Sequence, residues 1–310
     1  MGGFARSVTP APLTIGVMPK SSGNPDFEDC RRGAEEAARE LGFALRWEGP
    51  PEPDAPRQAR IVERWVQDGL SAIAVSVESR IQLTPTLKAA RSRGVKVLTW
   101  DADADPEARD FAVVPATPDG IAHALSFEVG RITSGTGAVA ALTSTLAAPN
   151  QNAWIAGFKD RLAREHPGVD LVDVRPTDDV QDKARRETLK LLQAHPKLKV
   201  IVGFCSPALP GAAEAVKESG RQDVRITGVS LPSLCRAYVE EGVVASVVFW
   251  KTRDLGYLAA ATAHALATGT LQHGAVFLAA GRLGNVIVRG DEIRLGRCHI
   301  VTKGNLDSLD

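Results

Sequence analysis

The chain alternates short apolar runs with longer segments in which apolar positions recur every three or four residues. Residues 13–19 form an apolar run suited to a strand that is buried on both faces. The signals of a helix then follow in order: Asn24 can cap its N-terminus, Pro25 fits the first turn, and Gly42 can end it. Such alternation of strand and helix is typical of parallel βαβ units.

The same pattern predicts the remaining elements in two series. In the first we expect strands at 13–19, 43–47, 72–77 and 95–101, and helices at 24–42, 57–69 and 84–94. In the second we expect strands at 111–114, 138–143, 169–175, 199–204, 224–229 and 245–250, and helices at 119–132, 152–165, 180–194, 210–219, 233–241 and 254–268, before a β-rich tail. The unit that ends at Gly42 resembles the unit that ends at Gly168, which is a weak internal repeat. The sequence therefore predicts an α/β protein with two similar, doubly wound parallel-sheet lobes.

Ligands of open parallel sheets bind beyond the carboxyl ends of the strands. The loops expected at these ends are 20–27, 101–105, 143–152, 205–210, 230–232 and 250–251. If the two lobes face each other, these loops converge on one cleft.

Composition narrows the possible partners. The 310 residues carry 37 Lys and Arg against 37 Asp and Glu, so the formal net charge is zero. A nucleic-acid partner would require an excess of basic residues on one face, and an anionic membrane would require a polybasic run, so neither is expected. Two long segments without Asp, Glu, Lys or Arg, 132–158 and 255–281, are interrupted by polar residues and predict buried core rather than membrane spans.

The four cysteines, Cys30, Cys205, Cys235 and Cys298, are scattered singly, and we interpret them as buried thiols. No C-x-x-C pair is present, so neither a structural zinc site nor any other metal or cofactor is expected. The N-terminus lacks the basic start and apolar core of a secretory signal, which leaves a cytoplasmic location and a removed signal peptide both open.

Enzymatic function is not supported by any nucleotide-binding, metalloprotease or hydrolase motif. Cys205 follows a buried strand, where a nucleophile could stand, but none of the six histidines is visibly paired with it, and a structural thiol is the simpler interpretation. The aspartates of 101–105 suit hydroxyl recognition as well as acid–base chemistry. A transcription-factor effector domain would need a helix-turn-helix before residue 13, where only a dozen residues stand.

Several ordered segments resemble the type I periplasmic binding proteins, the sugar-binding proteins of bacterial ABC transporters, in the branch that holds the rhamnose-binding and autoinducer-2-binding proteins. The resemblance runs from Ile15 to about Asn305. Its segments are Val17–Lys20, Asn24–Phe27, Thr99–Asp103 with Asp105–Phe111, Asn150–Trp154, Ser206–Ala213, Ser230–Pro232, Phe249–Trp250, Asp254–Tyr257, Gly281–Gly284 and Lys303–Asp307.

The resemblance implies two α/β lobes joined by three hinge crossings that close on a ligand. By position, residues 1–103 and 251–279 would form the N-terminal lobe, and residues 104–250 and 280–310 the C-terminal lobe. The crossings would then lie near residues 103, 250 and 280.

The resemblance also implies ligand contacts. In the autoinducer-2 branch, a lysine matches Lys20, an aspartate matches Asp101, an Asp-Gln pair falls on Asn150-Gln151, and a proline and an alanine match Pro210 and Ala212. The change to Asn150 favours a rhamnose-like pattern over the autoinducer-2 pattern. The chain also departs from the family at Asp26, where a second aromatic residue is usual, at Val114-Pro115 and at Lys251.

These residue types suit a sugar. Carboxylates and side-chain amides form two-point hydrogen bonds with hydroxyls, and aromatic rings cover the apolar C–H face. The candidate ligand-binding residues are Lys20, Asn24, Phe27, Asp101, Asp103, Asn150, Gln151, Trp154, Pro210, Ala212, Trp250 and Lys251. Structural roles remain open for some of them: an ion pair with Arg109 for Asp101, helix caps for Asn24 and Asn150, core packing for Phe27 and a surface position for Lys251.

The sequence thus predicts a non-enzymatic receptor that traps a monosaccharide, or a similar small polyhydroxylated ligand, between two lobes, with a rhamnose-like ligand favoured. An autoinducer-2 receptor and an α/β enzyme acting on a sugar are the alternatives. We expect a monomer that docks on an ABC permease from the periplasm or another extracytoplasmic site, and no nucleic-acid partner.

Overall fold

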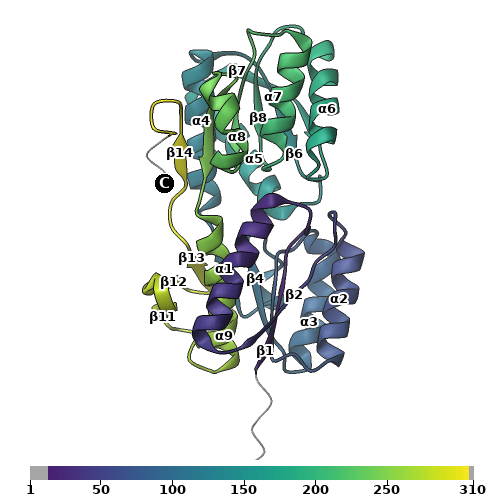
Figure 1. Ribbon diagram of the computed structural model, residues 1–310, viewed down its shortest axis with the longest axis vertical. Helices are drawn as coiled ribbons and strands as arrows, with labels where there is room; N and C mark the ends of the chain where they lie inside the picture. The colour runs from purple at the N-terminus through teal and green to yellow at the C-terminus, as the bar shows by residue number, and fades with distance from the viewer. Residues whose placement is uncertain (1–12, 307–310) are drawn as a thin grey trace, which may run out of the picture.

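A computed structural model of the chain describes residues 13–306 and shows two α/β lobes stacked along the long axis of the molecule (Figure 1). The first lobe is built on an eight-stranded sheet in the order β11-β12-β13-β5-β4-β3-β1-β2. The second lobe is built on a six-stranded sheet in the order β14-β10-β9-β8-β6-β7. The two-lobed α/β architecture expected from the sequence is therefore present.

The first lobe contains the N-terminal third of the chain and a later segment. Its strands are β1 (Thr14–Met18), β2 (Ala44–Trp47), β3 (Ala72–Val75), β4 (Lys96–Trp100), β5 (Phe111–Val114), β11 (Phe277–Ala279), β12 (Asn285–Arg289) and β13 (Glu292–Arg294). Its helices are α1 (Pro25–Leu41), α2 (Ala55–Gln67), α3 (Arg80–Ser92) and α9 (Thr252–Ala267). Helices α2 and α3 pack together, and α1 packs along α9.

The second lobe contains most of the remaining chain. Its strands are β6 (Thr136–Thr143), β7 (Gly168–Pro176), β8 (Leu198–Gly203), β9 (Arg225–Val229), β10 (Val244–Phe249) and β14 (His299–Val301). Its helices are α4 (Pro118–Thr133), α5 (Pro149–Glu165), α6 (Gln181–Ala194), α7 (Ala208–Ser219) and α8 (Pro232–Glu240). Helix α4 packs on α5 and α6 packs on α7.

Two of the three expected crossings lie later in the chain than the sequence suggested. Strand β5 pairs with β4 in the first sheet, and β13 pairs with β5, so residues 111–114 and 285–294 belong to the first lobe. The chain crosses between the lobes within 115–117, 250–251 and 295–298. The first crossing lies later because the chain does not leave the first lobe in residues 101–110. It turns back there through a short 3₁₀ helix (Pro106–Ala108), which places β5 beside β4.

An ion-pair cluster holds this turn in place. The guanidinium of Arg109 is 2.7 and 2.9 Å from the two carboxylate oxygens of Asp103 and 2.7 Å from Oδ2 of Asp291. Arg109 is buried, and its burial lowers its pKa, but the two carboxylates outweigh this effect and raise the pKa above the ordinary value. The cluster ties the turn to the loop between β12 and β13.

Helices α1 and α9 approach each other at two glycines. A Cβ atom on Gly33 would lie 1.8 Å from the carbonyl oxygen of Arg253, and one on Gly256 would lie 1.8 Å from the carbonyl oxygen of Cys30. Only glycine permits this distance between the two backbones. The close packing fixes the N-terminal turn of α1, which faces the other lobe (Figure 1).

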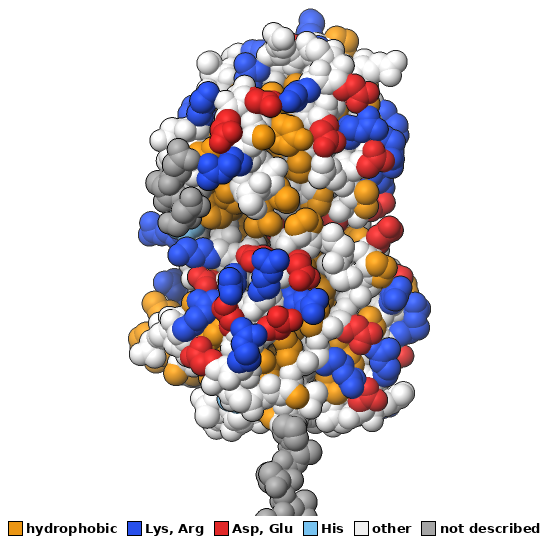
Figure 2. Space-filling view, viewed as in Figure 1, with side chains coloured by type: hydrophobic (Ala, Val, Ile, Leu, Met, Phe, Trp, Pro, Cys, Tyr) orange, Lys and Arg blue, Asp and Glu red, His pale blue; other side chains and the backbone are white. Residues whose placement is uncertain are grey.

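The surface shows basic and acidic side chains interspersed on both lobes (Figure 2), as expected from a net charge of zero. No helix within residues 13–306 combines the length and apolar character needed to cross a bilayer. All four cysteines are free thiols; Cys30, Cys205 and Cys235 are buried as expected, whereas Cys298 is only partly buried.

Candidate functional site

The loops at the carboxyl ends of the strands of both lobes meet at one cavity, as predicted. Eight of the candidate residues line it: Lys20, Asn24, Phe27, Asp101, Asn150, Gln151, Trp154 and Trp250. The cavity has a volume of about 30 Å³, which is room for one or two water molecules. The lobes are therefore closed on each other in this conformation.

A polar network joins the lobes at the cavity. Lys20 follows β1 and its Nζ donates to Oδ1 of Asn150 (3.2 Å), which belongs to the first turn of α5. Asn150 Nδ2 donates to Oδ1 of Asp101 (3.1 Å), which follows β4. Lys20 Nζ also lies 3.6 Å from Oδ2 of Asp101, and that oxygen accepts a hydrogen bond from Ser76 Oγ (2.8 Å).

Asp101 has an unusual backbone conformation. Its φ of 59° lies in the left-handed region, which aspartate tolerates better than most residues other than glycine. The turn is fixed by the hydrogen bond that its amide donates to the carbonyl of Val113 (2.9 Å). Trp100, the residue before it, is buried in the core and donates from Nε1 to the carbonyl of Met18 (3.1 Å).

Lys20 remains charged although it is buried. Burial alone would lower its pKa, but the carboxylates of Asp101, Asp179 and Glu78 outweigh the loss of solvation and raise it above the ordinary value. Lys20 is therefore a fixed cationic donor at the base of the cleft.

Two predicted polar residues hold loops in place. Asn24 caps α1, as expected, and accepts a hydrogen bond from the amide of Asp26 (3.0 Å). Gln151 accepts hydrogen bonds from Thr143 Oγ1 (2.6 Å) and the amide of Ser144 (2.7 Å). Asn150 is not the cap of α5, because that helix begins at Pro149 after Ala148, and its side chain is free to face the other lobe.

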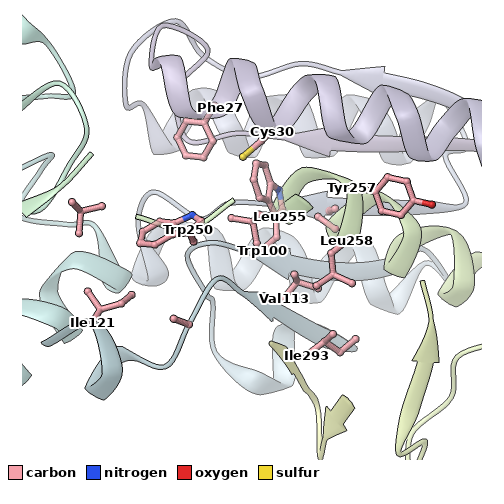
Figure 3. Close-up of a cluster of buried hydrophobic side chains, with 14 of the residues drawn as sticks. Phe27, Cys30, Trp100, Val113, Ile121, Trp250, Leu255, Tyr257, Leu258 and Ile293 are labelled. Carbon is pink, nitrogen blue, oxygen red and sulfur yellow. The ribbon is translucent and has the colours of Figure 1, made fainter. Parts of the chain in front are cut away.

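Aromatic side chains form the apolar part of the lining. The rings of Trp154 and Trp250 meet edge to face with centroids 5.8 Å apart, and Phe27 meets Trp100 in the same manner at 5.6 Å. Phe27 and Trp250 extend from different elements toward the same space (Figure 3). These rings belong to a hydrophobic cluster that runs through both lobes, so Phe27 both packs in the core and lines the cavity.

Two aspartates in the lining lack the partners that Asp101 has. Asp26 accepts a hydrogen bond from Ser206 Oγ of the other lobe through Oδ2, while its buried Oδ1 has no hydrogen-bond partner among residues 13–306. Burial, reinforced by the charges of Asp101 and Asp179, raises the pKa of Asp26 to about 7 despite the bond from Ser206. Asp179 precedes α6, and burial raises its pKa although Lys20 opposes the shift.

Cys205 also lines the cavity, but its environment does not favour a nucleophile. Its sulfur lies 3.4 Å from Thr177 Oγ1, and burial raises the pKa of the thiol well above the ordinary value. No histidine is among the described residues that line the cavity. The thiolate that covalent catalysis requires is thus disfavoured.

Four predicted residues lie outside the cavity. Asp103 is engaged by Arg109, so Asp103, and not Asp101, forms the pair with that arginine. Pro210 and Ala212 are buried within α7. In this part of the second lobe the cavity is lined by Phe204–Ser206, which precede α7. Lys251 precedes α9 and is exposed.

Some lining residues were missed as ligand candidates. Asp179 follows β7, and the loop at the carboxyl end of this strand was left out of the expected set although it holds two adjacent aspartates. Ser206 and Thr252 lie within or next to expected loops, but nothing in their local sequence distinguishes them. Asp26 was noted only as a departure from the family.

Comparison with known proteins agrees with this architecture. The family model described as periplasmic binding protein domain matches residues 15–271. The D-ribose/D-allose-binding protein of Pseudomonas aeruginosa is 26% identical over 248 residues, which span 76% of each chain. A solute-binding protein of an ABC transporter from Clostridium phytofermentas, solved with bound L-rhamnose, is 26% identical with a TM-score of 0.89, covering 96% of this chain and 98% of that one.

LsrB from Clostridium saccharobutylicum, solved in complex with AI-2, shares the fold with a TM-score of 0.89 at 24% identity, over 96% of this chain and all of the other. Two α/β lobes that close over a lined cavity define the class of two-lobed solute-binding proteins. The chain belongs to the periplasmic binding protein family. These relatives are named as binding proteins, one of them as a solute-binding protein of an ABC transporter, and not as enzymes, in agreement with the expectation from the sequence.

Proposed function

We propose that this protein is the solute-binding receptor of an ABC transporter, and that it traps a monosaccharide or a similar small polyhydroxylated ligand between its lobes. The observation that carries the proposal is the inter-lobe network of Lys20, Asp101 and Asn150 beside the aromatic pair Trp154–Trp250. The charged and amide groups can form hydrogen bonds with the hydroxyls of a sugar, and the aromatic rings can cover its apolar C–H face. A 6-deoxy sugar such as L-rhamnose, which has a methyl edge, suits this combination.

The same contacts suggest how the ligand is retained. Lys20 and Asp101 belong to the first lobe and Asn150 to the second, so a ligand that bonds to these three groups bridges the lobes. A bridging ligand gains its contacts only in the closed state and therefore shifts the population toward it. In the closed conformation the three residues bond to one another, and a ligand has to exchange these bonds for its own.

A ligand-dependent closed surface is what a membrane permease can recognise. We infer that the partner is the permease of an ABC transporter, that the receptor acts as a monomer, and that it works in the periplasm or at another extracytoplasmic site. The absence of a single-sign charge field on the visible face agrees with a small, neutral or weakly charged ligand rather than a polyanion (Figure 2).

The test is a thermal-shift screen of L-rhamnose, other aldoses, amino sugars, sugar acids and autoinducer-2, followed by calorimetry of each compound that stabilises the protein. We expect at least one polyhydroxylated compound to raise the melting temperature and to bind with about micromolar affinity, because several charge-assisted hydrogen bonds form at once. Small-angle scattering should show a compact form in the presence of that ligand. The absence of stabilisation by every compound in the panel would overturn the proposal.

A further inference from the structure

The cavity holds an excess of negative groups. Among the described residues that line it, the carboxylates of Asp26, Asp101 and Asp179 face a single basic side chain, that of Lys20. Glu78 lies close enough to Lys20 and Asp101 for their charges to act on it, and Thr145 Oγ1 donates to its carboxylate from the other lobe. The protein as a whole is neutral, so this local excess is not a consequence of its composition.

The partners of these carboxylates differ. Asp101 is satisfied by Ser76, Asn150 and the ammonium of Lys20. Neither oxygen of Asp179 has a hydrogen-bond partner among residues 13–306, although its side chain is buried with only 8% of the residue exposed.

Asp26 adds a third unpartnered carboxylate oxygen, Oδ1. The side chains of Asn24, Ser144 and Cys205 lie close enough to Asp179 for weak hydrogen bonds that lower its pKa, but none of them has the distance and angle of a full hydrogen bond. Among the carboxylates that line the cavity, three buried acceptor atoms are thus available to a donor; Oε2 of Glu78, which does not line it, also lacks a hydrogen-bond partner among residues 13–306.

Unpaired buried carboxylates are costly, because transfer of a charge out of water requires a compensating charge or hydrogen bonds. The pKa values of Asp26 and Asp179 are raised for the same reason, because burial disfavours the charged form of each carboxylate. A neutral sugar hydroxyl would supply hydrogen bonds but would leave the excess negative charge buried when the lobes close.

We propose that the ligand carries a protonated amine as well as hydroxyls, and that Asp26 and Asp179 bind its ammonium group, as in an amino-deoxy sugar. An ammonium offers three donors and one positive charge, which matches the three free acceptors and compensates part of the excess charge. A metal ion is a poorer match, since residues 13–306 contain no group of three His, Cys, Asp or Glu side chains arranged to hold one. The rest of the ligand then contacts the inter-lobe network and the aromatic rings.

This inference rests on the proposed function and names its ligand class more closely. The experiment compares matched pairs by calorimetry at pH 7.5: D-glucosamine with D-glucose, D-galactosamine with D-galactose, and D-mannosamine with D-mannose, together with 3-amino and 6-amino analogues. In at least one pair the amine should bind about tenfold to a hundredfold more tightly than the hydroxyl compound, the range expected for hydrogen bonds to charged groups. The N-acetyl derivative, which lacks the charge, should lose this advantage.

Two conservative variants locate the ammonium. Asp26→Asn and Asp179→Asn keep the size of the side chain, and each should reduce the preference for the amine over the matched neutral sugar, measured as the ratio of their affinities, by about tenfold. Asp178→Asn is the control: Asp178 is the neighbour of Asp179, has a similar φ of 54°, and pairs with Lys183 instead of lining the cavity. This variant should keep the preference for the amine.

The outcomes separate the two proposals. If neutral sugars bind and no amine exceeds its partner, the amine inference is wrong and the receptor function stands. If the preference for the amine persists in both Asp26→Asn and Asp179→Asn, the ammonium is not bound by these residues and the inference also fails. If neither neutral nor amino sugars bind, both proposals fail.

Discussion

At the scale of single residues, the two aspartates of the segment after β4 have opposite roles although they are two positions apart. Asp101 adopts a left-handed backbone conformation and faces the other lobe, where it meets Asn150. Asp103 faces the buried Arg109 and stabilises the turn that returns the chain to β5. The side chain of Asp101 therefore belongs to the binding cleft, whereas the side chain of Asp103 stabilises the fold.

We predict that neutralising these two aspartates separates binding from stability. Asp101→Asn should lower ligand affinity by about tenfold or more, because a hydrogen bond to a charged group contributes about 1.5–3 kcal/mol, and asparagine tolerates the positive φ. Asp103→Asn should lower the free energy of unfolding by about 1–3 kcal/mol, because a buried guanidinium loses one of its two carboxylates, and should leave affinity almost unchanged. Calorimetry and denaturant titration of both variants measure the two effects; equal losses of affinity would contradict the division of roles.

At the scale of secondary-structure elements, the packing of α1 on α9 positions the site. The N-terminal turn of α1 contributes Asp26 and Phe27 to the cavity, and the two glycines of the helix crossing determine how deeply this turn sits. The helix also carries Asn24 at its cap. A change in the helix crossing therefore alters both stability and the shape of the cavity.

We predict that Gly33→Ala destabilises the protein although alanine is the better helix former. The added Cβ would lie 1.8 Å from a backbone oxygen of α9, so the helices must separate, at a cost of about 1–3 kcal/mol. Arg32→Ala, an exposed neighbour on the same helix, should change the unfolding free energy by less than about 0.5 kcal/mol. Thermal and denaturant unfolding of both variants test this, and an unchanged or raised melting temperature for Gly33→Ala would show that the crossing is not tight.

Most elements could be predicted from the sequence because their signals are local. The cap at Asn24, the proline after it and the apolar stripe of α1 lie within one segment, and the structure places the helix there. The first and third crossings could not be located, because whether β5 joins the first or the second sheet depends on its pairing with β4 and β13, and β13 lies almost 180 residues later. The role of Asp103 was hidden for the same reason, since Asp291 completes its cluster with Arg109.

At the scale of the whole molecule, closure depends on groups that bond across the lobes. Ser206 donates to Asp26, Thr145 to Glu78, and Asn150 joins Asp101 and Lys20. Opening the lobes returns these groups to water. The charge state of the interface therefore sets how readily the ligand-free protein closes.

The last prediction concerns the pH dependence of the closed conformation. The carboxyl of Asp26 faces Asp29 on its own helix, Asp101 after β4 and Asp179 before α6, with Ser206 as its donor and Lys20 as the nearby cation. Its pKa is about 7 in the closed form, against an ordinary value of 3.8. The closed form therefore holds a proton that the unfolded chain releases near pH 4, and it loses this stabilisation as the pH rises through about 7.

We expect the unfolding free energy of the protein without ligand to fall by about 1–3 kcal/mol between pH 5 and pH 8. This change is smaller than the full shift in the pKa of Asp26 implies, because the lobes can open and hydrate the carboxylate. Small-angle scattering should show a larger radius of gyration at pH 8 than at pH 5.5. Asp26→Asn, which cannot ionise, should reduce both trends, while Glu28→Gln on the exposed face of α1 should preserve them. A wild-type stability and radius that stay constant across this range would mean that Asp26 is hydrated in the ligand-free protein and that the lobes are already open at acid pH.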